Sequence, residues 1–192
     1  MEVYLIRHAE VDYSRVADPA AARLTPQGVE QARRVAEQMA AWDVQLLCAS
    51  TMIRAEMTAD AVTDRLPDLI RWDLEELEEV GIADLEGQPT AAPRASAWTP
   101  ELLRYGLERT WIRVMAAWAR IRIYTETYGI ERVAIISHGY VIKLMLLNWL
   151  GYDWSTHDRF RFPVDFASST RVTLIDGASG PIVQFDWLNR LP

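Results

Sequence analysis

Two arginines and two histidines occupy similar places in this sequence. Arg7 and His8 follow a short apolar run, Arg54 comes shortly after a second run, and His138 follows a third. Guanidinium groups bind phosphate oxygens through paired hydrogen bonds and stabilise the charge that develops in phosphoryl transfer. A neutral imidazole is a nucleophile at phosphorus, and a second, protonated imidazole adds positive charge. These residue types predict phosphoryl transfer if the fold brings them together.

A leaving alkoxide would also need a proton from a carboxylic acid. The stretch from residue 75 to residue 86 is rich in glutamate and offers several candidates: Glu75, Glu76, Glu78, Glu79 and Glu86. Acidic runs of this kind usually form a solvated face. Spacing alone therefore does not select the acid.

The predicted secondary structure gathers these residues at one edge of a sheet. Three apolar runs rich in β-branched residues predict buried strands, at Val3–Ile6, Val44–Cys48 and Val133–Ile136. Helical patterns follow at 26–40, at 52–66, from 99 onward and at 140–150, and the tail predicts a hairpin of 171–175 and 182–187.

Strands that alternate with helices predict an α/β fold, and ligands of such folds bind at the carboxyl ends of the strands. We expect a three-layer α/β/α sandwich with a mainly parallel central sheet and an antiparallel edge strand. The carboxyl ends of its parallel strands would then carry both histidines and both arginines.

Composition narrows the class of partner. The chain has 192 residues, half of them apolar, and we expect one domain over residues 1–192. A net charge of −7 without a basic run argues against nucleic acid and anionic membranes as partners, but permits a small anionic substrate. The single Cys48, an N-terminus without a signal-peptide pattern and the short apolar stretch 140–150 predict a soluble, cytoplasmic protein.

Five sequence blocks, in order, resemble those of the histidine phosphatase superfamily (phosphoglycerate-mutase-like, branch 1). Residues 5–10 (LIRHAE) resemble its Arg-His-Gly signature, and 24–32 (LTPQG followed by Gln-Ala) its next block. Residues 50–59 resemble the block that supplies a second arginine, 77–87 the block with the catalytic acid, and 137–139 (SHG) the last one. Each block is weakly specific by itself, whereas five in order form a strong resemblance.

The resemblance implies a role for each matched residue. His8 would be the nucleophile that is transiently phosphorylated, and Glu79 the proton donor and later the base. Arg7, Arg54 and His138 would form the phosphate pocket. Ser14 stands where many members place an asparagine that binds a phosphate oxygen, and Ala9 replaces the usual glycine. No metal and no cofactor would be required, because the arginines supply the charge.

The resemblance also implies a small phosphorylated substrate and an insertion at about 87–132 that covers the site. The oligomeric state, including a homodimer, stays open, and the sequence does not name the substrate. Because this insertion is short and has no lysine, we expect hydrolysis of a phosphomonoester rather than the phosphate migration of a mutase. A non-enzymatic domain that binds a phosphorylated ligand is the third alternative within this fold.

A competing motif involves Cys48. Cys48 and Arg54 have the Cys-x5-Arg spacing of thiol phosphatases. The loop between them lacks glycine, and Ala55 stands where a hydroxyl residue is usual, so the motif is weak. We therefore expect Cys48 to be a buried core residue.

Overall fold

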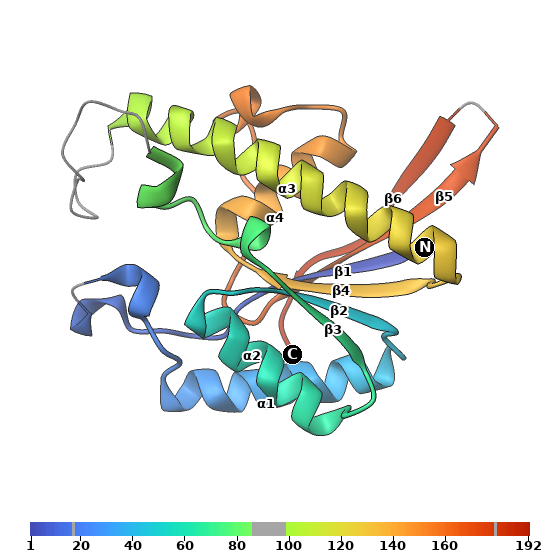
Figure 1. The fold of residues 1–192 in the computed structure, drawn as a ribbon, viewed down its shortest axis with the longest axis horizontal. Helices are drawn as coiled ribbons and strands as arrows, with labels where there is room; N and C mark the ends of the chain where they lie inside the picture. The colour runs from blue at the N-terminus through green and yellow to red at the C-terminus, as the bar shows by residue number, and fades with distance from the viewer. Residues whose placement is uncertain (17, 86–98, 179) are drawn as a thin grey trace.

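The computed structural model describes residues 1–16, 18–85, 99–178 and 180–192 (Figure 1). The strands in this part of the chain are β1 (Glu2–Arg7), β2 (Leu46–Ser50), β3 (Ile70–Leu74), β4 (Arg132–Ser137), β5 (Ser169–Gly177) and β6 (Gly180–Arg190). The α-helices are α1 (Pro26–Ala41), α2 (Ile53–Arg65), α3 (Pro100–Tyr128) and α4 (Gly139–Trp149). Short 3-10 helices are η1 (Tyr13–Arg15), η2 (Pro19–Ala21), η3 (Glu75–Leu77), η4 (Ile82–Leu85) and η5 (Trp154–Thr156).

The sheet has the strand order β3-β2-β4-β1-β5-β6. The first four strands are parallel, β5 pairs antiparallel with β1, and β6 pairs antiparallel with β5. The α/β fold with a mainly parallel sheet is therefore confirmed. Its antiparallel part consists of two strands, and the hairpin is longer than the sequence pattern indicated.

The strand β3 was missing from the sequence-based prediction. Its apolar residues Ile70, Trp72 and Leu74 alternate with polar ones, which is the pattern of a strand with one buried face. The strand is short and runs directly into the acidic stretch that begins at Glu75. Because β3 runs parallel to β2 and β4, all three strands end at the same edge of the sheet, and the acidic stretch begins there.

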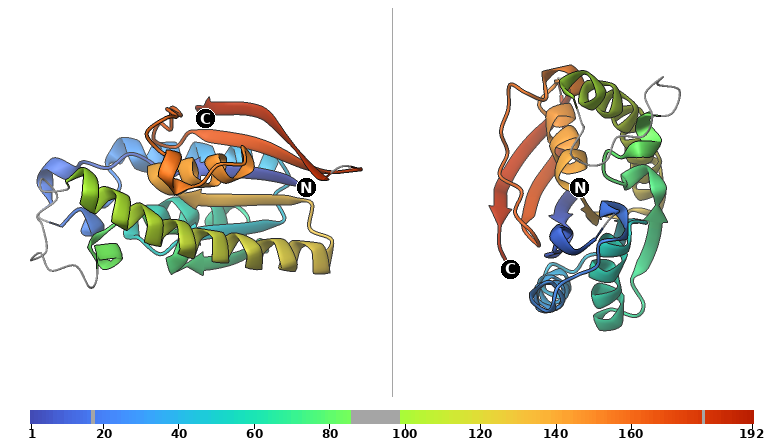
Figure 2. Two further views of the ribbon diagram at one scale, coloured as in Figure 1. Left: turned by 90° about the horizontal axis from the view of Figure 1, so that it is seen from above. Right: turned by 90° about the vertical axis from the view of Figure 1, so that its left-hand side faces the viewer.

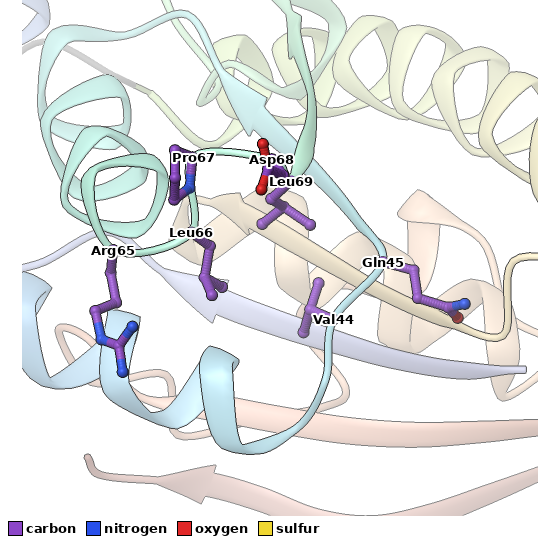
Figure 3. A pocket seen from close by; sticks show the side chains of 7 residues that line it. All are labelled: Val44, Gln45, Arg65, Leu66, Pro67, Asp68 and Leu69. Carbon is purple, nitrogen blue, oxygen red and sulfur yellow. The ribbon is translucent and has the colours of Figure 1, made fainter.

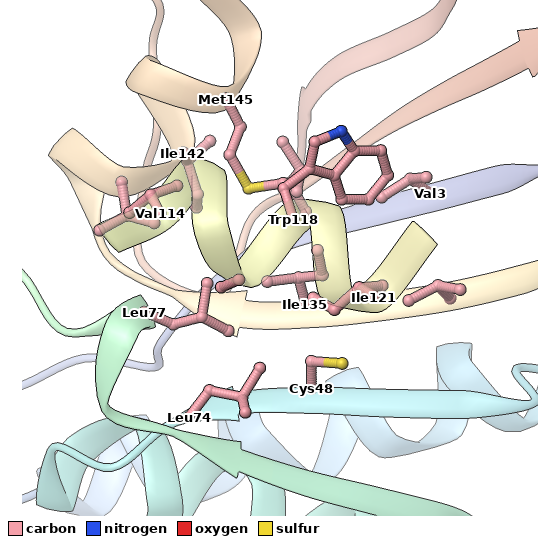
Figure 4. Close-up of a cluster of buried hydrophobic side chains, with 14 of the residues drawn as sticks. Val3, Cys48, Leu74, Leu77, Val114, Trp118, Ile121, Ile135, Ile142 and Met145 are labelled. Atoms are coloured by element: carbon pink, nitrogen blue, oxygen red, sulfur yellow. The ribbon is translucent and has the colours of Figure 1, made fainter. Parts of the chain in front are cut away.

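Helices cover both faces of the sheet, as Figures 1 and 2 show: α1 and α2 lie on one face, and α3 and α4 on the other. Each face has its own apolar core. The core beneath α3 and α4 includes Val114, Trp118 and Ile121 from α3, together with Cys48 from β2 (Figure 4). These apolar side chains of α3 thus serve core packing. The predicted three-layer sandwich is confirmed.

The start of α1 is held close to the residues after β1. Thr25 caps this helix by accepting a hydrogen bond from the backbone N–H of Gly28, and Pro26 occupies its first turn. A Cβ atom on residue 28 would overlap the carbonyl oxygen of Glu10, so glycine is required there by the close approach. This contact links the second sequence block to the first.

A pocket lies at the amino ends of β2 and β3 (Figure 3). Val44, Gln45 and the segment Arg65–Leu69 line it, and these residues precede the two strands. The pocket is therefore at the opposite edge of the sheet from His8 and His138. In the described part of the chain, no helix has both the length and the apolar character needed to cross a bilayer.

Candidate active site

Three neighbouring strand ends bring His8, Arg54 and His138 together. His8 follows β1, His138 follows β4, and Arg54 lies in the first turn of α2, which begins shortly after β2. Because β4 pairs with both β1 and β2, the three ends are adjacent. The imidazole centroids are 5.1 Å apart, and all three side chains are buried. The sequence-based grouping of these residues is thus reproduced by the geometry.

Hydrogen bonds fix the orientation of the His8 ring. Its Nδ1 lies 2.8 Å from the carbonyl oxygen of Ala9, which can only accept, so Nδ1 carries the proton of the neutral ring. The lone pair of Nε2 accepts a hydrogen bond from Nε of Arg54 at 3.2 Å. Burial, and to a lesser extent the charges of Arg54 and Arg7, lower the pKa of His8 to about 3. His8 is therefore a neutral imidazole whose Nε2 carries the lone pair.

His138 is bonded on one ring nitrogen only. Its Nε2 lies 2.7 Å from the hydroxyl oxygen of Ser50, and this hydroxyl also accepts the backbone N–H of Met52. The Ser50 hydroxyl donates to Nε2 in the tautomer that carries the ring proton on Nδ1, and Nδ1 is buried without a hydrogen-bond partner. Burial and the positive groups nearby hold the pKa of His138 well below its usual range. These influences favour the neutral imidazole, and the protonated second histidine expected from the residue types stays a prediction.

The two arginines are held in place by the backbone of other segments. A terminal nitrogen of Arg7 donates to the carbonyl of Val164 at 2.7 Å, and its guanidinium lies 4.0 Å from the ring centroid of Phe166. Nε of Arg7 is buried without a partner. Arg54 donates to the carbonyl of Pro19 at 3.1 Å. Sequence reasoning missed the segment with Val164 and Phe166, because its contacts with Arg7 depend on distant parts of the chain.

Glu79 lies beside His138, the residue that immediately precedes α4. One carboxylate oxygen accepts the backbone N–H of Tyr140 and the other that of Val80, both at 3.2 Å. Burial of the carboxyl group raises its pKa, and this effect outweighs the opposing hydrogen bonds and the charges of Arg54 and Arg7. A raised pKa suits a carboxyl group that must give up a proton.

Among the other glutamates, Glu78 accepts a hydrogen bond from the Thr51 hydroxyl at 2.7 Å. Glu86 lies outside the described residues. The geometry therefore favours Glu79 over Glu78 as the acid, in agreement with the resemblance.

Ser14 lies in η1, where its hydroxyl is exposed and donates to Asp12 at 2.6 Å. The neighbouring Tyr13 ring approaches the Arg54 guanidinium at 5.8 Å, so this segment borders the site. A phosphate-binding role of Ser14 stays a prediction. Within the expected insertion at 87–132, residues 86–98, with Arg94 and Trp98, lie outside the described part, and most of the remainder is α3.

Cys48 belongs to the apolar core, as expected. Its side chain is fully buried in the interior of β2, among the residues packed beneath α3 and α4 (Figure 4). Burial raises the pKa of its thiol strongly, which disfavours the reactive thiolate. Arg54 interacts with His8 instead, so the Cys-x5-Arg spacing does not form a thiol-phosphatase loop.

Similar folds occur among solved phosphatase structures. The mycobacterial glucosyl-3-phosphoglycerate phosphatase complexed with VO3 matches with a TM-score of 0.77 at 20% identity, over 98% of this chain and 99% of that one. At this identity the match supports the fold alone.

Curated relatives and a family model extend the comparison. The mitochondrial serine/threonine-protein phosphatase Pgam5 of Drosophila persimilis is 30% identical over 181 residues, 90% of this chain but 58% of that protein. The probable phosphoglycerate mutase GpmB of Enterobacter sp. (strain 638) is 24% identical, over 98% of this chain and 90% of that protein. The model of the histidine phosphatase superfamily (branch 1) matches residues 3–181. This chain therefore belongs to the histidine phosphatase superfamily, branch 1.

Proposed function

We propose that this chain is a phosphomonoester hydrolase that acts on a small phosphorylated metabolite through a phosphohistidine at His8. The observation that carries this proposal is that two residues of the buried cluster with His8 each keep a polar nitrogen without a hydrogen-bond partner. Nε of Arg7 and Nδ1 of His138 are both buried and unpaired. Buried N–H groups normally have partners, and the oxygens of a phosphoryl group would supply them here.

In the first step, Nε2 of His8 attacks phosphorus while the bond from phosphorus to the ester oxygen breaks. Protonated Glu79 gives its proton to the leaving oxygen, and the alcohol departs. Arg7 and Arg54, with the Nδ1–H of His138, stabilise the charge on the three equatorial oxygens. In the second step, water attacks the phosphohistidine and gives a proton to the Glu79 carboxylate. The N–P bond breaks, which releases phosphate and restores both His8 and Glu79.

The arginines supply the positive charge in this mechanism, so we propose that no metal ion or cofactor takes part. Activity should then be unchanged by EDTA. We also propose a cytoplasmic location, which the lone and buried Cys48 supports because such a thiol is typical of reducing compartments.

The decisive experiment is to trap the phosphorylated protein. Brief incubation with p-nitrophenyl phosphate, followed by mass spectrometry without acid, should locate phosphate on His8. His8→Ala should lose the label and the turnover. His157→Ala is the matched control, because this third histidine lies near the surface and contacts the carbonyl of Trp154. Wild-type turnover by His8→Ala would refute the mechanism.

The mutase alternative is supported by the similarity to the probable phosphoglycerate mutase GpmB. A mutase must keep its phosphohistidine from water until a second hydroxyl of the substrate arrives. We favour hydrolysis, and the test supplies 3-phosphoglycerate with and without 2,3-bisphosphoglycerate. Isomer interconversion that outpaces phosphate release, and that requires the bisphosphate, would establish a mutase.

A further inference from the structure

The backbone around Glu79 is held by a single side chain from another layer of the fold. Arg113, in the middle of α3, donates to the carbonyl oxygens of Glu76 and Glu78 at 2.7 and 2.6 Å. It also donates to the carbonyl of Glu79 at 3.2 Å. One guanidinium therefore bonds three carbonyls within four consecutive residues, including that of the proposed acid.

Asp84, which follows Glu79 in the chain, bonds the same guanidinium. Its two carboxylate oxygens each lie 3.1 Å from a nitrogen of Arg113, which is the paired geometry of a strong arginine–carboxylate contact. The same carboxylate accepts the backbone N–H of Gly81 at 2.9 Å. The Asp84 side chain is 9% exposed and that of Arg113 is 21% exposed, so water competes little for these bonds.

We infer that Arg113, oriented by Asp84, is a positioning residue that holds Glu79 in place for proton transfer. This inference rests on the proposed function, because it assigns Glu79 the role of acid. Arg113 bonds none of the groups assigned to the phosphate pocket, and a lysine at position 113 would keep the positive charge that helps to lower the pKa of His138. A loss in the lysine variant would therefore report on the position of Glu79. Proton transfer needs the donor within hydrogen-bond reach of the leaving oxygen, and a small displacement from that geometry is costly.

Arg113→Lys tests this role, because lysine keeps the charge but cannot bond several carbonyls and a carboxylate at once. We expect kcat/KM to fall by about 10- to 100-fold for an alkyl phosphate. It should change little for p-nitrophenyl phosphate, whose leaving group needs no proton. Arg109→Lys is the matched control, because Arg109 lies one turn earlier on the same helix, is exposed, and donates to the Tyr105 hydroxyl at 3.3 Å. For Arg109→Lys, the ratio of kcat/KM between the two substrates should equal that of the wild type.

A double variant separates positioning from general damage. With Glu79→Gln already present, Arg113→Lys should cause little further loss on the alkyl phosphate, because the group that it positions is gone. Equal losses on both substrates, or losses that multiply in the double variant, would overturn the inference and leave the proposed function intact. If Arg113→Lys does not fold, Asp84→Asn serves instead, with a smaller loss expected in the same direction. Failure of the proposed function would appear separately, as turnover by His8→Ala.

Discussion

The residues assigned to the phosphate pocket lie beside the segment 75–79 that ends in Glu79, which we call the acid segment. The fold holds these two regions in different ways. Arg7, His8 and His138 are at or next to the ends of two paired strands with buried interiors, β1 and β4. Glu79 follows the edge strand β3 and the short helix η3, and its backbone depends on polar contacts with Arg113.

Strand ends in the middle of a sheet are fixed by many apolar contacts and ladder hydrogen bonds, none of which is decisive. The acid segment is anchored in the core by Leu77 and is otherwise held by a few polar bonds. The phosphate pocket should consequently tolerate surrounding substitutions better than the acid segment does. Substrates with good and poor leaving groups report on the two regions separately.

The largest expected effect concerns the acid itself. Glu79→Gln keeps the shape of the side chain but removes its proton, and general acids typically contribute about 10²- to 10⁴-fold to rate. We expect a loss of kcat/KM in this range for an alkyl phosphate and a small loss for p-nitrophenyl phosphate. Glu78→Gln, which changes a carboxylate bonded to Thr51, is the control. Equal losses on both substrates would show that Glu79 has a structural role.

The pH dependence should also divide between the two regions. His8 loses its nucleophilic lone pair when it is protonated, and its pKa of about 3 means that kcat/KM falls only in strong acid. Glu79 must be protonated, so activity on an alkyl phosphate declines as the pH rises through its raised pKa. We therefore expect an acidic optimum for the alkyl phosphate.

Glu79→Gln provides the check on the alkaline side. The limb due to Glu79 should disappear in this variant, whereas the limb due to substrate ionisation near pH 6 should persist. An acid limb near pH 6.5 in the wild type would contradict a buried, neutral His8.

A smaller effect is expected at Ser50, whose hydroxyl bonds His138 of the proposed phosphate pocket. Ser50→Ala removes the hydroxyl that bonds Nε2 of His138, so the ring proton is no longer fixed on Nδ1. We expect kcat/KM to fall by about fivefold, as for the loss of one hydrogen bond of roughly 1 kcal/mol. The loss should be similar for both kinds of substrate, unlike that of Glu79→Gln. Ser155→Ala, at an exposed serine, is the control, and a leaving-group-dependent loss at Ser50 would place it with the acid.

The smallest effect on turnover is expected at Cys48. Cys48→Ser places a hydroxyl in the apolar core, and the free energy of unfolding should decrease by about 1–3 kcal/mol. Turnover per folded molecule should stay close to that of the wild type, because Cys48 packs beneath α3 away from His8. Inactivation by alkylation of Cys48 that phosphate prevents would instead restore the thiol-phosphatase interpretation.

Sequence alone determined the parts of this protein that local pattern encodes. Apolar runs followed by Arg7-His8 and by His138 predicted which strands end in polar side chains, because a buried strand needs a continuous apolar stretch. Thr25-Pro26 and Thr99-Pro100 predicted where α1 and α3 begin, because their side chains and dihedral angles suit helix N-termini. The family resemblance added Glu79, which spacing could not distinguish from its neighbours.

Only the tertiary structure decided how these residues are bonded. The tautomers of His8 and His138 depend on Ala9 and Ser50, and the lowered pKa of both rings depends on burial that no local pattern specifies. The sequence did not distinguish Arg113 from the other arginines of α3. It contacts Glu79 because α3 crosses the sheet beside the end of β3. Such contacts join residues more than thirty positions apart, and their geometry follows from the packing of layers rather than from sequence spacing.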